Sequence, residues 1–375
     1  MTREMIMDIV IANEEDYLGV HMTNEDVDAN QTEKKGNRTG KNHTVRIAAL
    51  LVFSCVLFFF SGYTWGNHAS KASAVETVPA QIIPVDLPDY TLIQLPSESD
   101  IQSMGYVIVT KDNRVIVVDG GVIGSTDRLY EILAKFGGHV DAWLVTHPHI
   151  DHVTALENMQ TLHPDITIDK IYGTLLDYDL AQTYEPDFAD NVKTFNDYIA
   201  TVSDRFQSVT TGMVITVGNL SIEVLQAGDP AETENYVNNQ SVVYRIGTAE
   251  EKVLFLGDLG AEGGALLAQT YGDGLNTDIV QMAHHGQAGV TQDVYQLIFP
   301  KYCLWPTPAY QWMNEYQPGD PYDSGTLETM TTRLWMDELS TQNIISKDGC
   351  AVLTVTGTSV IVAQYPDQTA YVHAT

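Results

Sequence analysis

The sequence predicts a layered α/β domain over residues 89–375, preceded by a single transmembrane helix. Three observations carry this prediction. Short apolar runs alternate with amphipathic stretches in two successive halves of the chain, which is the pattern of sheets covered by helices. One uncharged apolar run, at 47–65, is just long enough to cross a bilayer. The segments that flank this run, 1–46 and 66–88, are polar or rich in small residues and proline.

The run at 47–65 is predicted to be an uncleaved anchor in the cell membrane. Five Lys and Arg side chains lie between positions 34 and 46, and such charge stays on the cytoplasmic side. Residues 1–46 are then a cytoplasmic tail, 66–88 a linker, and the large domain is extracellular. A cleaved signal peptide is the alternative, because small residues follow at 72–74, but the leading segment is long for one.

Charge and cysteine content exclude several classes of protein. Residues 67–375 contain 13 basic and 40 acidic side chains, so the domain repels polyanions and offers no basic footprint for nucleic acid. Three cysteines exclude a disulfide scaffold. Cys303 and Cys350 either form one extracellular bridge or are two buried, apolar side chains.

The elements of the domain follow from hydrophobic spacing and from capping residues. Helical spacing predicts helices at 125–136, 153–162, 191–206, 261–271 and 325–339. Apolar runs predict a hairpin at 104–120 and strands at 140–146, 167–173, 213–216, 220–226, 241–247, 252–256, 278–283, 343–345 and 350–363, with a helix–strand pair over 291–305.

The chemistry concentrates where the predicted strand 140–146 ends, in the run HPHIDH. Imidazole and carboxylate together suit zinc, manganese or iron. His147 and His149 are two residues apart, so an extended backbone can aim both at one ion, while Asp151 and His152 face a second. The end of a strand is a usual place for ligand sites. A chance surface run is the alternative, and three His with one Asp in six residues argue against it.

Three further strand ends supply matching residues. Asp258 ends VLFLGD, and a carboxylate there can bridge two metals. His284 and His285 follow the predicted strand at 278–283. Asp119 ends VIVVD and can orient a metal-binding histidine from behind. Each of these residues has a plainer interpretation as a turn or surface residue when taken alone.

The order VVDGG, THPHIDH, NNQSVVYRI, FLGD and HHG resembles the metallo-β-lactamase superfamily over residues 90–363. Within it, the sequence is most similar to the soluble hydrolase domain of the DNA-uptake channel ComEC and its stand-alone relatives. The resemblance implies a four-layer αβ/βα sandwich and two divalent metal ions, zinc first and manganese as the alternative. One ion would bind His147 and His149, and the second Asp151, His152 and His285, with Asp258 between the two.

The resemblance also assigns the remaining motif residues. His285 is favoured as the ligand in HHG and His284 as an acid or hydrogen-bond donor to substrate, although the reverse assignment stays open. Many members have a further histidine ligand before the Asp of FLGD, but this chain has none between His163 and His284. It has the Asn-Asn-x-Ser pattern instead, with Asn239 and Ser241 expected behind the ligands. The first ion therefore has fewer protein ligands.

A second departure is the segment 304–324, which is rich in Trp and Tyr among acidic residues. Its aromatic rings either surround a cationic head group or pack as an ordinary long loop.

These residues predict metal-assisted hydrolysis of a phosphodiester or another ester, in a small molecule or the cell envelope. Two ions activate a shared water, Asp151 accepts its proton, and His284 helps to stabilise the developing charge. A nuclease of the ComEC type is one alternative, against which the acidic surface and single membrane span count. A non-catalytic, metal-binding sensory ectodomain is the other, against which the intact HxHxDH run counts.

Overall fold

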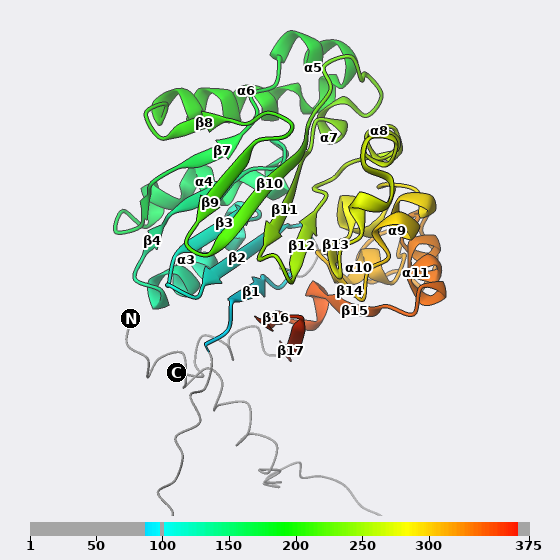
Figure 1. Ribbon diagram of the computed structural model, residues 1–375. Helices are drawn as coiled ribbons and strands as arrows, with labels where there is room; N and C mark the ends of the chain where they lie inside the picture. The colour runs from blue at the N-terminus through cyan, green and yellow to red at the C-terminus, as the bar shows by residue number, and fades with distance from the viewer. Residues whose placement is uncertain (1–86, 98–100, 367–375) are drawn as a thin grey trace, which may run out of the picture. The chain divides into compact units, whose positions relative to one another are not determined.

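The computed structural model describes residues 87–97 and 101–366 (Figure 1). The predicted tail (1–46), the predicted anchor (47–65) and all but the end of the predicted linker (66–88) lie outside these residues. Within the described ranges, every helix is too short or too polar to span a membrane.

An eight-stranded sheet forms the first half of the domain. Its strands lie in the order β17 (Ser359–Tyr365), β16 (Cys350–Thr356), β1 (Tyr90–Gln94), β2 (Gly105–Thr110), β3 (Val115–Asp119), β5 (Ala142–Leu144), β7 (Ile171–Gly173) and β8 (Phe206–Ser208). The strands from β17 to β3 pair antiparallel, whereas β3, β5, β7 and β8 run parallel. The predicted hairpin at 104–120 is β2 and β3, and Asn113 takes the left-handed conformation in its turn.

A seven-stranded sheet forms the second half. Its order is β15 (Gln342–Ile345), β14 (Tyr302–Trp305), β13 (Ile279–Gln281), β12 (Lys252–Phe255), β11 (Val242–Gly247), β10 (Leu220–Ala227) and β9 (Val214–Val217). Again one part is antiparallel, β9 to β12, and the other part is parallel, β12 to β15. A separate small pair joins β4 (His139–Val140) to β6 (Thr167–Ile168).

Three hydrophobic clusters show how these sheets pack. One contains side chains from both sheets, and in it the ring of Tyr106 on β2 meets that of Phe255 on β12 at 5.1 Å. The second joins the first sheet to α3 (Thr126–Lys135), α4 (Ile150–Leu162) and α6 (Pro186–Thr201). The third joins the other sheet to α8 (Ala261–Tyr271), α9 (Gln292–Ile298) and α11 (Thr329–Glu338). Helices therefore cover the outer face of each sheet, as Figure 1 shows, and the predicted αβ/βα layering is confirmed.

Short elements complete the domain between these layers. They are α5 (Tyr178–Tyr184), α7 (Tyr236–Asn239), α10 (Ala309–Trp312) and the 3-10 turns η2 (Ile123–Ser125), η3 (Gly272–Leu275), η4 (Ala283–Gly286) and η5 (Ser346–Asp348).

Several predicted boundaries are wrong. The strand at 167–173 is two strands, β6 and β7, in different sheets. The helix predicted at 191–206 starts at Pro186, whose fixed φ suits a first helical position, and ends at Thr201. The helix predicted at 153–162 starts at Ile150, inside the histidine run. Strand β1 (Tyr90–Gln94) was not predicted, because its five residues are too few for an alternating apolar pattern to stand out.

Packing decides the cysteine alternative and accounts for two of the aromatic rings in the segment 304–324. Cys303 and Cys350 are both free and buried, in the third and second hydrophobic clusters respectively, so the bridge is wrong. Trp305 is fully buried and meets Trp312 edge-on at 5.2 Å, while the guanidinium of Arg333 lies 4.1 Å from the Trp312 ring centre. These two rings belong to the packing of the second half.

Candidate metal centre

The predicted ligands come from three strand ends that face one another across the two sheets. His147 and His149 lie between β5 and α4, and Asp151 and His152 lie in the first turn of α4. Asp258 follows β12, and His285 lies in η4, directly after β13. Parallel neighbours present their carboxyl ends at one edge of a sheet, so residues far apart in sequence meet there.

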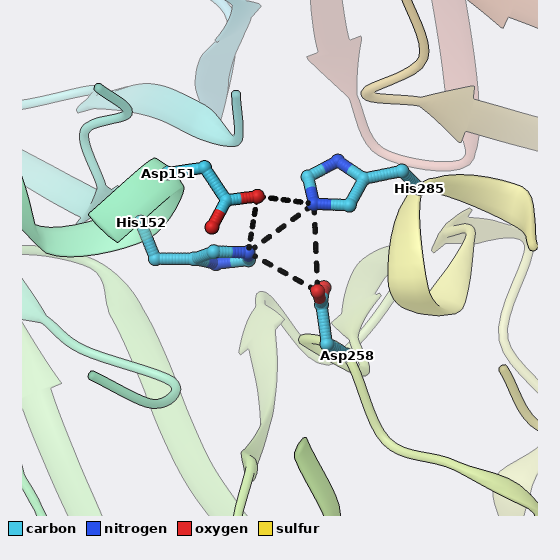
Figure 2. Close-up of side chains that lie close together, drawn as sticks. All are labelled: Asp151, His152, Asp258 and His285. Carbon is cyan, nitrogen blue, oxygen red and sulfur yellow. Dashed lines mark hydrogen bonds and ion pairs between the residues drawn. The ribbon is translucent and has the colours of Figure 1, made fainter. Parts of the chain in front are cut away.

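Asp151, His152, Asp258 and His285 form one group, here named the four-residue cluster (Figure 2). His285 Nε2 lies 3.0 Å from Asp151 Oδ2 and 3.4 Å from Asp258 Oδ2. His152 Nε2 lies 3.3 Å from Asp258 Oδ2 and 3.3 Å from His285 Nε2. Two imidazole nitrogens and two carboxylate oxygens thus converge on one small volume.

Hydrogen bonds on the far side of the two imidazole rings show which nitrogen of each neutral ring carries the hydrogen and which directs a lone pair into that volume. His285 Nδ1 lies 2.8 Å from the carbonyl oxygen of Pro306, which only accepts, so Nδ1 carries the hydrogen. His152 Nδ1 donates in the same way to Asp119 Oδ2 at 2.8 Å. In the neutral rings both Nε2 atoms are therefore acceptors, and they face each other at 3.3 Å. Such an arrangement needs a cation between them.

His147, His149 and Asp258 form a second group, the His147–His149 cluster. His147 Nε2 lies 3.0 Å from His149 Nδ1 and 3.9 Å from Asp258 Oδ2. Asp258 is a member of both clusters and is only 2% exposed, yet its Oδ1 atom has no hydrogen-bond partner. A buried carboxylate oxygen without a partner is costly, and a bound cation would satisfy it. The donor set therefore fits divalent metal ions.

The pKa values show the same demand for positive charge. Burial lowers the pKa of His285, but Asp258 and Asp151 outweigh it and raise that pKa to about 10. Burial also lowers the pKa of His152, but three carboxylates outweigh this effect and raise that pKa well above its usual value. His152 and His285 together hold the pKa of Asp258 well below its ordinary range, against the effect of burial. Without a metal ion, protons on the two imidazoles balance the carboxylates.

The other cluster behaves differently. Burial lowers the pKa of His149 to about 4, and burial together with the nearby His152 lowers the pKa of His147 well below its usual value. Both rings therefore stay neutral at physiological pH and keep lone pairs for a metal ion.

Asp119 and Thr146 hold the histidines in place. Asp119 Oδ2 accepts from His152 Nδ1 and from Thr146 Oγ1, each at 2.8 Å, and Oδ1 accepts from the Thr146 amide at 2.7 Å. Because the Thr146 hydroxyl donates to Asp119, its oxygen accepts from His147 Nδ1 at 3.1 Å. Asp119 thus lies behind His152, where a residue that orients a metal-binding histidine was predicted. Thr146 was overlooked, although it stands directly before the histidine run.

Asn239 and Ser241 hold the backbone around Asp258. Ser241 Oγ accepts from the Asp258 amide at 3.0 Å. Asn239 Oδ1 accepts from the amides of Gly260 and Gly263 at 3.0 and 3.1 Å. The fully buried Gln281, which the sequence did not single out, accepts from the Leu256 and Gly257 amides at 2.8 Å.

The structure separates the two histidines of HHG. His285 is fully buried in the four-residue cluster, whereas the His284 side chain is 18% exposed and its Nε2 lies 3.9 Å from Asp258 Oδ2. Both residues have positive φ, 49° and 55°. This left-handed turn sends successive side chains to different places, and Gly286 completes it where a Cβ would strike the Trp305 ring at 2.3 Å.

A cavity of about 230 Å³ opens beside both clusters. His149, Asp151, Asp258 and His284 line it on the metal side. The rest of its lining includes residues of the α5–α6 junction, α6 and α7, namely Glu185, Phe188, Asn191, Asn235 and Asn238, here named the wall. Asn238 is the first residue of the Asn-Asn-x-Ser pattern, but none of these residues was predicted to line the site, because no metal chemistry marks them.

A family model supports the architecture. The model described as the beta-lactamase superfamily domain matches residues 114–275, which include the histidine run and Asp258. The match covers less than half of the chain, and the two-sheet α/β sandwich described above agrees with it. The match does not reach His285, and the finer likeness to the ComEC-like group stays a prediction.

Solved structures with this fold are also similar to the chain, while no curated protein matches its sequence. The metallo-β-lactamase fold protein YhfI from Bacillus subtilis is 14% identical, over 73% of this chain and 100% of that chain, with a TM-score of 0.42. Yeast PDE1 is 11% identical, over 69% and 98%, with a TM-score of 0.42. A diphosphatase of the PhnP family is 12% identical, over 57% and 85%, with a TM-score of 0.36.

Proposed function

We propose that this protein is a binuclear metal-dependent hydrolase of phosphodiester or other ester bonds. The observation that carries the proposal is the convergence of His152 Nε2, His285 Nε2 and two carboxylate oxygens on one point, beside a second cluster that shares Asp258. We further propose that the chain is anchored through 47–65, with the domain outside the cell. The uncharged apolar run and the positive charges before it support that topology.

The residues fit a division of labour. His147 and His149 would hold one ion, Asp151, His152 and His285 the other, and Asp258 both. Two such ions supply Lewis acidity and an activated water. Zinc suits the imidazole-rich donor set, and manganese suits the carboxylate oxygens.

Asp151 and His284 face the cavity and are the candidates for proton transfer. Asp151 Oδ2 lies 3.0 Å from His285 Nε2 in the four-residue cluster, so its carboxylate is next to the reacting centre and can accept the proton of the attacking water. His284 is more exposed than its neighbour and can donate a hydrogen bond to the leaving oxygen or to a developing negative charge. The reaction consumes one water: a new P–O or C–O bond forms and the bond to the leaving alcohol breaks.

The test of this proposal is metal content together with turnover. The full chain, purified in detergent without chelator, should contain close to two equivalents of zinc or manganese by elemental analysis. It should hydrolyse bis(p-nitrophenyl) phosphate or a p-nitrophenyl ester in proportion to that metal. Tight metal binding with no turnover of phosphodiester, ester or DNA would favour the sensory alternative, and turnover of DNA alone would favour the nuclease.

A further inference from the structure

The wall of the cavity contains groups that can accept hydrogen bonds from a ligand. Asn238 lines the cavity and is only 4% exposed. Its Nδ2 donates to Asn235 Oδ1 at 3.0 Å, which orients the amide, and its Oδ1 has no partner. A buried carbonyl oxygen without a donor is costly unless a ligand supplies one.

Glu185 brings a negative charge to the same wall. It lies at the junction of α5 and α6, and its Oε2 accepts from the amide of Val237, the neighbour of Asn238, at 2.8 Å. This bond ties the carboxylate to α7, so Glu185 and Asn238 are held next to each other. Burial raises the pKa of Glu185, and a cation beside it would relieve that cost.

The charged residues that line the cavity also favour a cationic ligand. Among the described residues, those that line it include no lysine or arginine. The carboxylates of Asp151 and Asp258 are committed to the clusters, which leaves Glu185 as the carboxylate free to meet substrate. The volume of about 230 Å³ is below the usual range for drug-sized ligands, so it suits a small head group rather than a polymer strand.

We propose that Glu185 and Asn238 form a subsite for a primary ammonium group of the substrate, close to the bond that is hydrolysed. The inference rests on the proposed hydrolase function and narrows its substrates to small amino-alcohol diesters. Glu185 supplies the charge, and Asn238 Oδ1 accepts one N–H. Phe188, whose ring lies 4.5 Å from that of His149, closes the wall between the subsite and the metal side.

The experiment uses four p-nitrophenyl phosphodiesters that differ in one group: 2-aminoethyl, 2-(trimethylammonio)ethyl, 2-hydroxyethyl and ethyl. The metal-loaded full chain should have a kcat/KM for the aminoethyl diester about tenfold or more above that for the hydroxyethyl diester, since a buried charged pair is lost. The trimethylammonio diester has the charge without an N–H and should fall between them. Equal rates for the aminoethyl and ethyl diesters would overturn the subsite while leaving the hydrolase intact.

Variants assign the preference to the two residues. Glu185→Gln should bring the aminoethyl-to-hydroxyethyl ratio close to one, whereas Asn238→Ala should lower the aminoethyl-to-trimethylammonio ratio. Asp187→Asn, which removes an exposed charge two residues from Glu185 and outside the cavity, should keep both ratios. A ratio that survives Glu185→Gln would contradict the proposal.

A binding measurement keeps the inference testable if none of the diesters is hydrolysed, the outcome that would contradict the proposed function. Calorimetry would compare 2-aminoethyl phosphate with 2-hydroxyethyl phosphate on the metal-loaded chain, and on Glu185→Gln. Tighter binding of the amine, lost in the variant, supports the subsite. Equal affinities would overturn it.

Discussion

The two candidate metal clusters share Asp258 but differ in how many ligand atoms the protein supplies to each. In the four-residue cluster, each imidazole is fixed from behind by an acceptor, and four ligand atoms converge. In the His147–His149 cluster, only two imidazoles and the shared carboxylate are present, and His149 Nε2 is buried without a partner. We infer that the first cluster binds its ion more tightly and that the second depends on water or substrate to complete it.

The largest expected effect is that of Asp258→Ala, which removes the ligand common to both clusters. It should abolish binding of both ions and lower turnover by roughly a thousandfold or more, because the buried imidazoles then lack their shared counter-charge. Elemental analysis and a phosphodiester assay measure the two effects. Asp273→Ala, an exposed aspartate in η3, serves as the control. Two retained ions in Asp258→Ala would contradict a shared ligand.

The two variants His285→Ala and His149→Ala test whether the two clusters differ in their affinity for an ion. Zinc titration of the unsubstituted protein should resolve a tight and a weaker ion. His149→Ala should keep about one tight equivalent. His285→Ala should lose the tight class, since His285 Nε2 is one of the four atoms that converge there and lies within 3.4 Å of an atom of each of the other three residues. If both variants lose the same class of ion, the clusters do not differ as their geometry indicates.

Asp119→Asn should have a smaller, indirect effect. The substitution keeps an oxygen near His152 Nδ1 and Thr146 but removes the charge that strengthens both hydrogen bonds. Affinity for the tight ion should fall about 10- to 100-fold, as measured by competition with a chelator. An unchanged affinity would mean that Asp119 stabilises the fold and has no influence on the metal centre.

The smallest expected effect concerns Glu157, a half-buried carboxylate whose Oε1 has no hydrogen-bond partner among the described residues. Glu157 lies on α4, and burial raises its pKa to about 7, whereas His152 and His285 lower the pKa of Asp258. Below pH 4.5 Glu157 is protonated in both the folded and unfolded states. Between pH 4.5 and about 7 only the folded state retains the proton. The contribution of Glu157 to stability therefore falls as the pH rises through this range and is constant above about pH 7.

Glu157→Gln should therefore raise the melting temperature at pH 8.5 and change it little at pH 5. The expected gain in the free energy of unfolding at pH 8.5 is about 1 kcal/mol or less, because the side chain is partly solvated. Thermal unfolding at the two pH values measures the difference. A larger gain at pH 5 than at pH 8.5 would reverse the sign and refute the assignment.

Much of this centre could be read from the sequence because metal ligands are chemically distinctive and often lie close together in the chain. His147, His149, Asp151 and His152 fall within six residues, and the strand ends at Asp119 and Asp258 are visible as apolar runs followed by Gly-Asp or Asp-Gly. The layered α/β class followed from the same alternation of runs.

Other features depended on contacts that no local pattern encodes. His284 and His285 are neighbours of the same type, and only the left-handed turn before Gly286 sends one into the four-residue cluster and the other to the cavity. The wall of Glu185 and Asn238 joins segments more than 50 residues apart through one backbone hydrogen bond. The cysteines stayed apart because they pack in different hydrophobic clusters.

The sequence by itself thus determined the layered class and the main ligand types, since both follow from spacing and side-chain chemistry within short windows. The tertiary structure decided the partition of ligands between the two clusters, the tautomers of the histidines and the polarity of the cavity. These depend on which atoms lie opposite one another after two sheets pack face to face, and that is a property of the packing rather than of any single segment.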